Sequence, residues 1–119
     1  MEIKLFDSEL KVMEVLWREG DLTAGEIAKI LKEEIGWNRN TTYTVIKKCV
    51  EKGAIKRLEP NYTCRTLISK EQVQEQETIE LINKMFDGSA EMFFATFINS
   101  KQLNQHDINK LKKIIDELK

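Results

Sequence analysis

The sequence of 119 residues predicts a mainly α-helical protein with one small β-hairpin. Most apolar residues recur at every third or fourth position, which is the spacing of one face of an α-helix. Residues 54–68 break this pattern with two short strand-like runs on either side of a Pro-Asn turn. A chain of this length, with 41% hydrophobic residues, suits one domain or a small domain with an appendage.

Two helices are predicted at the start of the chain. The first is expected to begin after Asp7 or Ser8, either of which can cap its free amides, and to end at Gly20. The second is expected to run to residue 34, because Thr23 and Glu26 have the spacing of a capping box. Their apolar stripes are formed by Leu10, Val12, Met13, Val15, Leu16 and Trp17, and by Ile27, Ile30, Leu31 and Ile35.

A third helix is expected from its cap, Asn38, to about Lys52, with Gly53 as a left-handed stop. One face is expected to be buried and consists of Thr42, Val45, Ile46, Cys49 and Val50. The opposite face consists of Asn40, Thr41, Thr44, Lys47, Lys48 and Glu51, with Tyr43 at the flank. Strands over residues 54–58 and 63–68 then complete three helices and a hairpin, which predict a winged helix-turn-helix domain over residues 1–69.

Residues 70–119 are expected to form a C-terminal three-helix region. Ser69 and Gln72 mark the start of a helix to about Phe86, a short helix follows over residues 90–98, and a last helix follows Asn104. Roughly 50 residues bury little apolar surface on their own, so this region is expected to pair with a second copy. The expected homodimer interface consists of Phe93, Phe94, Phe97, Ile98, Ile108, Leu111, Ile115 and Leu118.

Positive charge is concentrated in one segment of a nearly neutral chain. Residues 38–68 contain seven Lys or Arg residues and two Glu residues, a net charge of +5, whereas the whole chain has a formal net charge of −1. Residues 1–37 carry −4 and residues 69–119 carry −2. A local positive patch of this kind is typical of a surface that binds a polyanion in one orientation.

In a winged-helix domain the third helix enters the major groove of DNA and the hairpin reaches the backbone or minor groove. Amide and hydroxyl groups near the helix start can read base edges, whereas later cations are suited to phosphates. The residues expected to contact DNA are Asn38, Arg39, Asn40, Thr41, Tyr43, Thr44, Lys47, Lys48, Arg57 and Arg65. Tyr43 has two interpretations, since its ring can pack either on a thymine methyl group or against the hairpin.

Other classes of function find little support. The only histidine, His106, has no accompanying Cys/His, paired-carboxylate or glycine-rich phosphate motif, so the chain is not expected to be an enzyme. Cys49 and Cys64 lack metal-ligand spacing and are expected to be free thiols, and no metal or cofactor is expected. No apolar run approaches the roughly 20 residues that cross a bilayer, and no signal peptide is evident. A cytoplasmic protein without membrane insertion is therefore expected.

Several motifs resemble the penicillinase repressors of the BlaI/MecI family, which also has copper-responsive, CopY-type relatives. They are Leu-Lys-Val-Met-Glu-Val-Leu-Trp over residues 10–17, Leu-Thr-Ala at 22–24, Trp37, Glu-Lys-Gly at 51–53 and Phe-Asp-Gly-Ser at 86–89. The resemblance implies a dimeric repressor of β-lactamase and penicillin-resistance genes that binds a palindromic operator. It also places DNA contacts at Asn40, Thr41, Tyr43, Thr44 and Lys48. The copper-responsive relatives have C-terminal cysteine pairs, which this chain lacks after Cys64.

Two departures from the family pattern affect its predictions. Residues 37–41 are Trp-Asn-Arg-Asn-Thr where the family commonly has Trp-Ser-Pro-Lys-Thr, so a different operator is expected. Relief of repression in the family follows cleavage of an Asn-Phe bond by a protease that a membrane sensor activates. The matching bond here is Thr96-Phe97, with threonine in place of asparagine. The alternative function is a winged-helix adaptor whose basic face binds an acidic protein without sequence-specific DNA binding.

Overall fold

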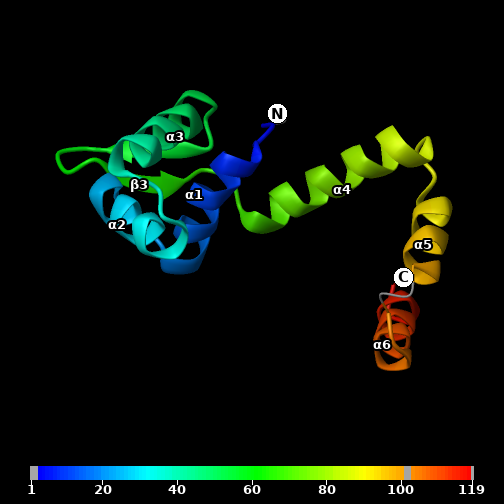
Figure 1. Cartoon of the computed structure of the whole chain (residues 1–119). Coiled ribbons are helices and arrows are strands. Elements are labelled where there is room, and N and C mark those ends of the chain that lie inside the picture. Colours follow the sequence, from blue (N-terminus) through cyan, green and yellow to red (C-terminus); the bar gives the residue numbers. More distant parts are fainter. Residues whose placement is uncertain (1–2, 101–102, 119) are drawn as a thin grey trace. The chain divides into compact units, whose positions relative to one another are not determined.

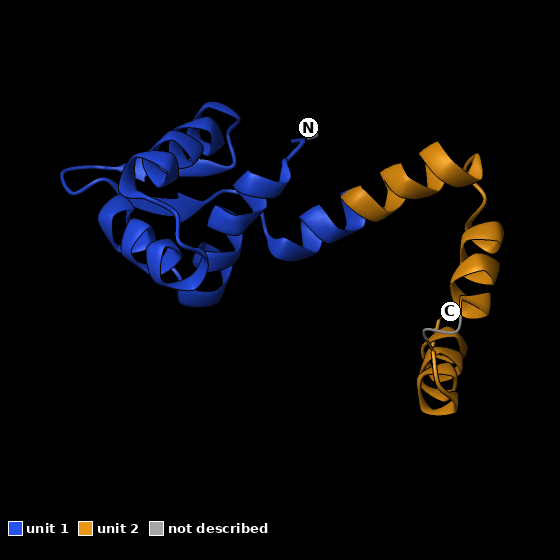
Figure 2. Ribbon diagram, in the orientation of Figure 1, with its two compact units in different colours: residues 1–76 blue, residues 77–119 orange. Residues whose placement is uncertain are grey.

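The computed structural model describes residues 3–100 and 103–118 and confirms a mainly helical fold with a small antiparallel sheet (Figure 1). The contacts divide the chain into two compact units, Met1–Gln76 and Glu77–Lys119 (Figure 2). The division falls inside helix α4 (Lys70–Phe86), whose first turns belong to the first unit. There Val73 joins the core, and the Gln76 amide donates a hydrogen bond to the Ile3 carbonyl (2.9 Å).

Helix α1 (Asp7–Glu19) begins one residue earlier than predicted, and neither Asp7 nor Ser8 caps it. Phe6 occupies the cap position, and its backbone amide donates to the carboxylate of Glu9 (2.7 Å). Glu9 is buried, with only 1% of its surface exposed, because the same carboxylate also accepts from the ammonium of Lys52 (2.6 Å). The expected cap was wrong because a distant lysine holds the Glu9 side chain at the start of the helix.

Helix α2 (Ala24–Ile35) has the predicted capping box. The Glu26 amide donates to the Thr23 hydroxyl (3.1 Å), and the Thr23 amide donates to the Glu26 carboxylate (2.9 Å). Gly36 follows in the left-handed conformation, with φ of 74°, which suits a residue without a Cβ atom. Ile35 is 42% exposed, so its predicted place in the buried stripe of this helix was wrong.

The sheet has three strands in the order β1–β3–β2, all antiparallel. Strands β2 (Ile55–Leu58) and β3 (Thr63–Thr66) form the predicted hairpin, and each is shorter than expected. Strand β1 (Leu22–Thr23) was not predicted, because two residues are too few to show a period of two. The turn between β2 and β3 projects beyond the helices of the unit (Figure 1).

Helix α3 (Arg39–Glu51) lies on a core to which every element of the first unit contributes. The largest buried core side chains are Met13, Ile27, Leu31, Ile46 and Ile55. Trp17 and Trp37 pack against this core and are partly buried, and the Trp17 indole donates to the Ile68 carbonyl (3.0 Å). The buried stripe of α3 therefore directs its opposite face outward.

The second unit contains the end of α4 and the helices α5 (Ala90–Asn99) and α6 (Gln105–Asp116). Phe93 contacts the rings of Phe86, Phe94 and Phe97, at centroid distances of 5.7, 5.6 and 6.3 Å. Neither α5 nor α6 contains a buried residue among those that the structure describes. Large exposed apolar side chains of these helices and of the residues that follow α6 include Met92, Phe94, Phe97, Ile98, Ile114, Ile115 and Leu118.

Candidate nucleic-acid interface

The outer face of α3 is exposed as the sequence predicted. Asn38 caps the helix by accepting a hydrogen bond from the Thr41 amide through Oδ1 (2.8 Å). Because Thr42, Val45, Ile46 and Cys49 are buried on one side, the remaining side chains face solvent. The exposed residues are Asn40, Thr41, Thr44, Lys47, Lys48 and Glu51. This helix presents amide and hydroxyl groups in its first turns and ammonium groups in its later turns.

One of these hydroxyl groups is already engaged. Thr44 Oγ1 donates to the Asn40 carbonyl one turn earlier (2.9 Å). Its hydrogen is thereby used within the helix, so the oxygen lone pairs and the methyl group remain for a ligand. Thr44 is therefore suited to accept a hydrogen bond from a base or to contact a thymine methyl group.

A row of two arginines and two tyrosines joins α3 to the hairpin. The Arg39 guanidinium donates to the Tyr43 hydroxyl (2.8 Å) and lies 4.8 Å from the centre of that ring. Tyr43 makes an edge-to-face contact with Tyr62, at 6.0 Å between ring centres. The Arg57 guanidinium lies 3.7 Å from the centre of the Tyr62 ring. Tyr43 thus packs toward the hairpin, which was one of its two expected positions.

The backbone of Tyr62 strengthens this connection. Its φ of 52° lies in the left-handed region that a tyrosine rarely adopts, and its carbonyl accepts from the Ala24 amide at the start of α2 (2.9 Å). Burial raises the pKa of the Tyr62 phenol above its ordinary value, so the ring stays neutral at physiological pH. A groove of about 520 Å³ between α3 and the hairpin is lined by Tyr43, Thr44, Lys47, Val50, Glu51, Arg57 and Tyr62.

Three of the cations counted in the positive segment are already paired with carboxylates. Lys52 contacts Glu9 (2.6 Å), Arg57 contacts Glu59 (2.7 Å) and Arg65 contacts Asp21 (2.8 Å). Two of these partners, Glu9 and Asp21, come from residues 1–37. The net charge of the segment therefore overstates the positive charge that is free to meet a polyanion.

The two hairpin arginines also face opposite ways. In strand register Arg57 pairs with the buried Cys64, whereas Arg65 pairs with the exposed Lys56. Because alternate residues of a strand point to opposite faces, Arg57 lies on the α3 side of the sheet and Arg65 on the other side. The structure therefore brings Arg57 together with the α3 residues but does not bring Arg65 to the same face.

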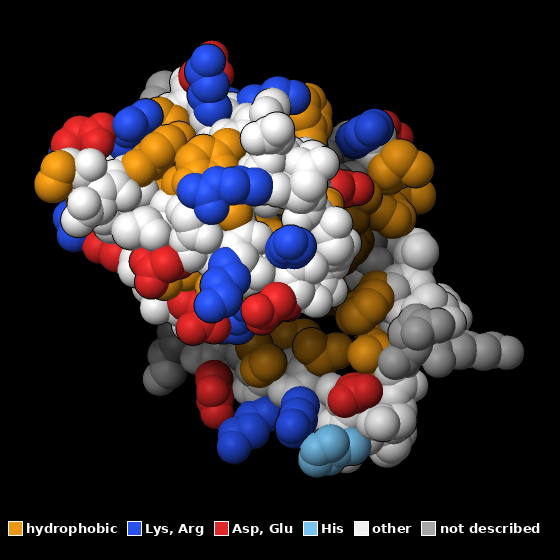
Figure 3. Space-filling view, turned by 60° about the vertical axis from the view of Figure 1, so that its left-hand side comes forward, with side chains coloured by type: hydrophobic (Ala, Val, Ile, Leu, Met, Phe, Trp, Pro, Cys, Tyr) orange, Lys and Arg blue, Asp and Glu red, His pale blue; other side chains and the backbone are white. Residues whose placement is uncertain are grey.

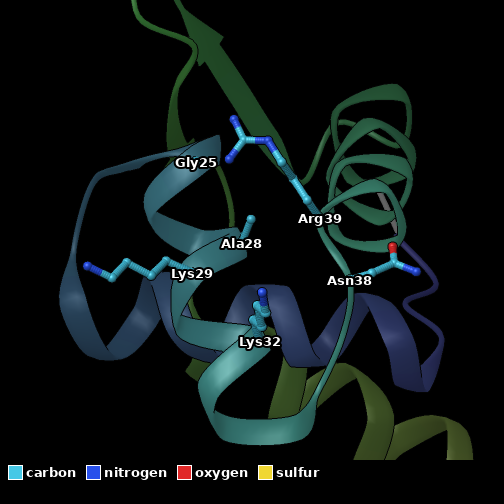
Figure 4. A pocket seen from close by; sticks show the side chains of 6 residues that line it. All are labelled: Gly25, Ala28, Lys29, Lys32, Asn38 and Arg39. Atoms are coloured by element: carbon cyan, nitrogen blue, oxygen red, sulfur yellow. The ribbon is translucent and has the colours of Figure 1, made fainter.

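Sequence reasoning missed two lysines on α2. Lys29 and Lys32 line a second groove, of about 390 Å³, together with Gly25, Ala28, Asn38 and Arg39. In Figure 4 the Arg39 side chain extends from the start of α3 toward Gly25. Within the described residues, neither lysine forms an ion pair. Their position in an acidic part of the sequence hid them, and the i, i+3 spacing of the two lysines was the available signal.

The surface shows the same mixture of charges. On the face drawn in Figure 3, lysine and arginine side chains lie among aspartate and glutamate side chains. Among the described cations of the candidate interface, those without an ion pair are Lys29, Lys32, Arg39, Lys47, Lys48 and Lys56. The free positive charge therefore extends from α3 to α2, whereas Lys56, the hairpin cation of this set, lies with Arg65 on the other side of the sheet.

The two cysteines do not form a reactive or metal-binding pair within the described residues. The thiols of Cys49 and Cys64 are free and buried, and burial raises the pKa of the first to about 12 and of the second to about 11. No cluster of three or more potential metal ligands occurs within residues 3–100 and 103–118. In the same described ranges, no helix has both the length and the apolar character needed to span a membrane.

Three helices, a hairpin and an exposed polar helix face define a winged-helix domain of the DNA-binding type. The family profile described as "Penicillinase repressor" matches residues 5–117. The chain belongs to the penicillinase repressor family, which confirms the resemblance in the sequence. This is a family of DNA-binding transcriptional repressors and not of enzymes.

Curated relatives match along nearly their whole length. The penicillinase repressor of Bacillus licheniformis is 26% identical over 121 residues, covering 98% of this chain and 92% of the relative. The methicillin resistance regulatory protein MecI of Staphylococcus aureus is 22% identical over 116 residues, covering 96% of this chain and 94% of the relative. The likeness thus includes the C-terminal unit as well as the winged helix.

Two solved structures are similar to the first unit. The solution structure of the DNA-binding domain of the repressor BlaI matches with a TM-score of 0.54 and 24% identity, covering 57% of this chain and 85% of that chain. The monomeric form of B. licheniformis BlaI in complex with the blaP half-operator matches with a TM-score of 0.51 and 25% identity, covering 59% and 89%. The winged-helix fold expected from the sequence is thereby confirmed.

Proposed function

We propose that this protein represses transcription in the cytoplasm by binding a palindromic DNA operator as a homodimer. The observation that carries the proposal is the outer face of α3, where exposed amide, hydroxyl and ammonium groups follow one another along a helix whose other face is buried. A similar fold has been solved in complex with a half-operator, which supports DNA as the ligand of this face. The relatives' names point to β-lactam resistance genes as the targets.

The proposed contacts divide by chemistry. Asn40, Thr41 and Thr44 lie at the end of α3 that approaches base edges, where they can donate or accept hydrogen bonds. Lys47 and Lys48 lie further along the helix and carry no ion pair within the described residues, so they are suited to backbone phosphates. The proposed set is completed by Asn38, Arg39, Tyr43, Arg57 and Arg65. Arg57 reaches a phosphate only by exchanging Glu59 for it, and Arg65, on the other side of the sheet, only by exchanging Asp21 for it.

The experiment that tests DNA binding is a selection followed by a salt series. Duplexes selected from a random pool by the purified protein should share a two-fold symmetric sequence. The selected duplex should bind at least about a thousandfold more tightly than a mixed sequence, and its affinity should fall steeply with salt. Weak binding to all sequences with little salt dependence would instead favour the adaptor function and refute sequence-specific repression.

The second unit supports the proposal of a dimer. This unit leaves apolar side chains at the surface, with Phe94 at 44%, Ile115 at 57% and Leu118 at 72% exposure. Burial of such side chains is worth about 1.5–3 kcal/mol each, which a second copy of the same unit can supply. Phe93, Phe97, Ile98, Ile108 and Leu111 complete the proposed interface.

Sedimentation velocity tests this interface directly. Wild-type protein should sediment as a dimer at micromolar concentration, whereas Ile115→Lys should shift it toward the monomer and lower the affinity for the palindromic duplex. Lys112→Gln, on the same exposed helix but outside the proposed interface, is the matched control and should remain dimeric. A monomeric wild-type protein that still binds the full palindrome with high affinity would overturn the proposal.

We propose that repression is relieved by hydrolysis of the Thr96–Phe97 bond. Both residues lie in α5 and are exposed, and a cut there separates α6 from the rest of the chain. The two half-site contacts would then lose their link, which removes the avidity of a dimer. If the protein remains intact and bound to DNA when incubated with a protease activated by a membrane β-lactam sensor, this part of the proposal fails.

A further inference from the structure

The groove between α2 and the start of α3 combines three cationic side chains with small residues. Lys29 and Lys32 come from α2 and Arg39 from α3, while Gly25 and Ala28 lie between them (Figure 4). Because these small residues fill little space, the groove of about 390 Å³ is open to a group the size of a phosphate. No pairing carboxylate competes for Lys29 or Lys32 within the described residues.

Of the three carboxylates on α2, Glu33 is exposed and forms no ion pair within the described residues, and the other two have other roles. Glu26 accepts the hydrogen bond of the Thr23 amide in the capping box, and Glu34 pairs with Arg18 (2.8 Å). Arg39 uses one of its nitrogen atoms to donate to the Tyr43 hydroxyl. A guanidinium has five N–H donors, so the others remain for a second acceptor. The groove is therefore lined by three cations and no carboxylate, and with Glu33 as the neighbouring free acid its surroundings carry a net positive charge beside the first turn of α3.

We propose that this groove binds a backbone phosphate of duplex DNA, with Lys32 and Arg39 as its principal contacts and Lys29 as a flanking charge. The inference rests on the proposed function, since it assumes that α3 enters the major groove. The start of α3 is the end that approaches base edges, so the adjoining groove faces the strand that borders them. Lys29 points away from α3 in Figure 4, and its flexible four-carbon stem lets the ammonium turn toward that strand.

This contact would attach α3 to the DNA backbone on the side of α2, while the hairpin would attach it on the other side. The groove beside α2 and the groove beside the hairpin share no lining residue. Arg39 lines the groove beside α2, and Tyr43 and Arg57 line the groove beside the hairpin. The Arg39–Tyr43 hydrogen bond and the Tyr43–Tyr62 ring contact lie between them. Two separate phosphate contacts would fix the helix orientation more firmly than one.

The test uses the full chain and a fluorescent DNA duplex of mixed sequence, measured by anisotropy across a salt series. Lys29→Gln/Lys32→Gln should lower the slope of log affinity against log salt by up to about 0.9, because the groove is proposed to neutralise one phosphate. The matched control is Lys11→Gln, an exposed lysine of α1 outside the groove, and should leave the slope unchanged. All three lysines are exposed, so the melting temperature should stay that of the wild type.

A second measurement locates the phosphate. In a second set of duplexes, one phosphate at a time is replaced by an uncharged methylphosphonate. At one position the wild-type protein should lose more affinity than the double variant, which keeps only Arg39 of the three cations. Equal slopes for wild type and double variant, or equal losses at every position, would overturn the inference and leave the proposed function intact. A wild-type protein without salt-dependent DNA binding would instead refute the proposed function, and this inference with it.

Discussion

Replacing Lys52 with alanine should destabilise the first unit while leaving the attraction to DNA unchanged. In the sequence this residue belongs to the positive segment, but the structure directs it inward. Its ammonium donates to the Glu9 carboxylate (2.6 Å) and to the Lys4 carbonyl (2.6 Å), and it lies 4.1 Å from the centre of the Phe6 ring. The variant therefore leaves the buried Glu9 carboxylate with the Phe6 amide as its remaining hydrogen-bond donor among the described contacts.

The expected magnitude follows from burial. Removing one partner of a buried ion pair costs about 3–5 kcal/mol. The side chain of Lys52 is 28% exposed and that of Glu9 is 1% exposed, so water replaces part of the lost interaction and the lower value, about 3 kcal/mol, applies. For a domain of this size, such a loss lowers the melting temperature by on the order of 10 to 20 °C.

Two assays on the same pair of variants separate stability from DNA binding. Both tryptophans, Trp17 and Trp37, lie in the first unit, so their fluorescence in urea reports its unfolding. Lys48→Ala is the matched control because Lys48 is exposed in the last turn of α3, one turn before Lys52, and carries no ion pair within the described residues. It should change stability by less than about 0.5 kcal/mol but lower the salt slope of DNA binding by about 0.9.

If Lys52→Ala lowers the salt slope as much as Lys48→Ala, or leaves the urea midpoint unchanged, Lys52 does not have this structural role. A double variant provides a further check. In Glu9→Gln/Lys52→Met both charges are absent, so much of the lost stability should return. A double variant that is less stable than Lys52→Ala would show that the packing of these side chains, and not their charge, determines the effect.

Three further outcomes are expected. Asn38→Ala should lower the free energy of unfolding by about 1 kcal/mol, since it removes the cap of α3; an unchanged urea midpoint would contradict this. Cys49 and Cys64 should resist a maleimide in the folded protein, and labelling as fast as that of an exposed thiol would disprove their burial. The free energy of unfolding should also decline as pH rises above the ordinary thiol pKa of 9.0, because the thiols of the unfolded chain ionise at lower pH than those of the folded chain. Tyr62→Phe should retain DNA affinity and Tyr62→Ala should weaken it, because Arg57 loses the ring beneath it; equal affinities by anisotropy would refute that support.

The parts of the site that depend on one helix alone were predictable. Asn38 caps α3, and the buried and exposed faces of that helix follow its period of 3.6 residues. The Thr23–Glu26 capping box was likewise predictable, as was the Ser69–Gln72 pair before α4, in which the Ser69 amide donates to the Gln72 side chain (2.8 Å). All of these features depend on residues three or four positions apart in the chain, so the spacing of residue types in the sequence is enough to predict them.

Contacts between distant residues were not predictable in the same way. Arg65 pairs with Asp21 across 44 positions, and Lys52 pairs with Glu9 across 43 positions. Neither spacing leaves a periodic signal in the sequence, because residues so far apart along the chain meet only in the folded structure. The count of charges by segment consequently overstated the positive charge of residues 38–68 and overlooked Lys32 on α2.

The sequence by itself determined the helices, the hairpin, the polar face of α3 and the membership of the family. These features follow from local periodicity, caps and motifs, which depend on neighbouring residues and carry over between relatives. The tertiary structure alone decided which cations are free for DNA, because Coulomb interactions depend on distance in space and not on position in the chain. It also decided the connection from Arg39 through Tyr43 and Tyr62 to Arg57, which links the recognition helix to the hairpin.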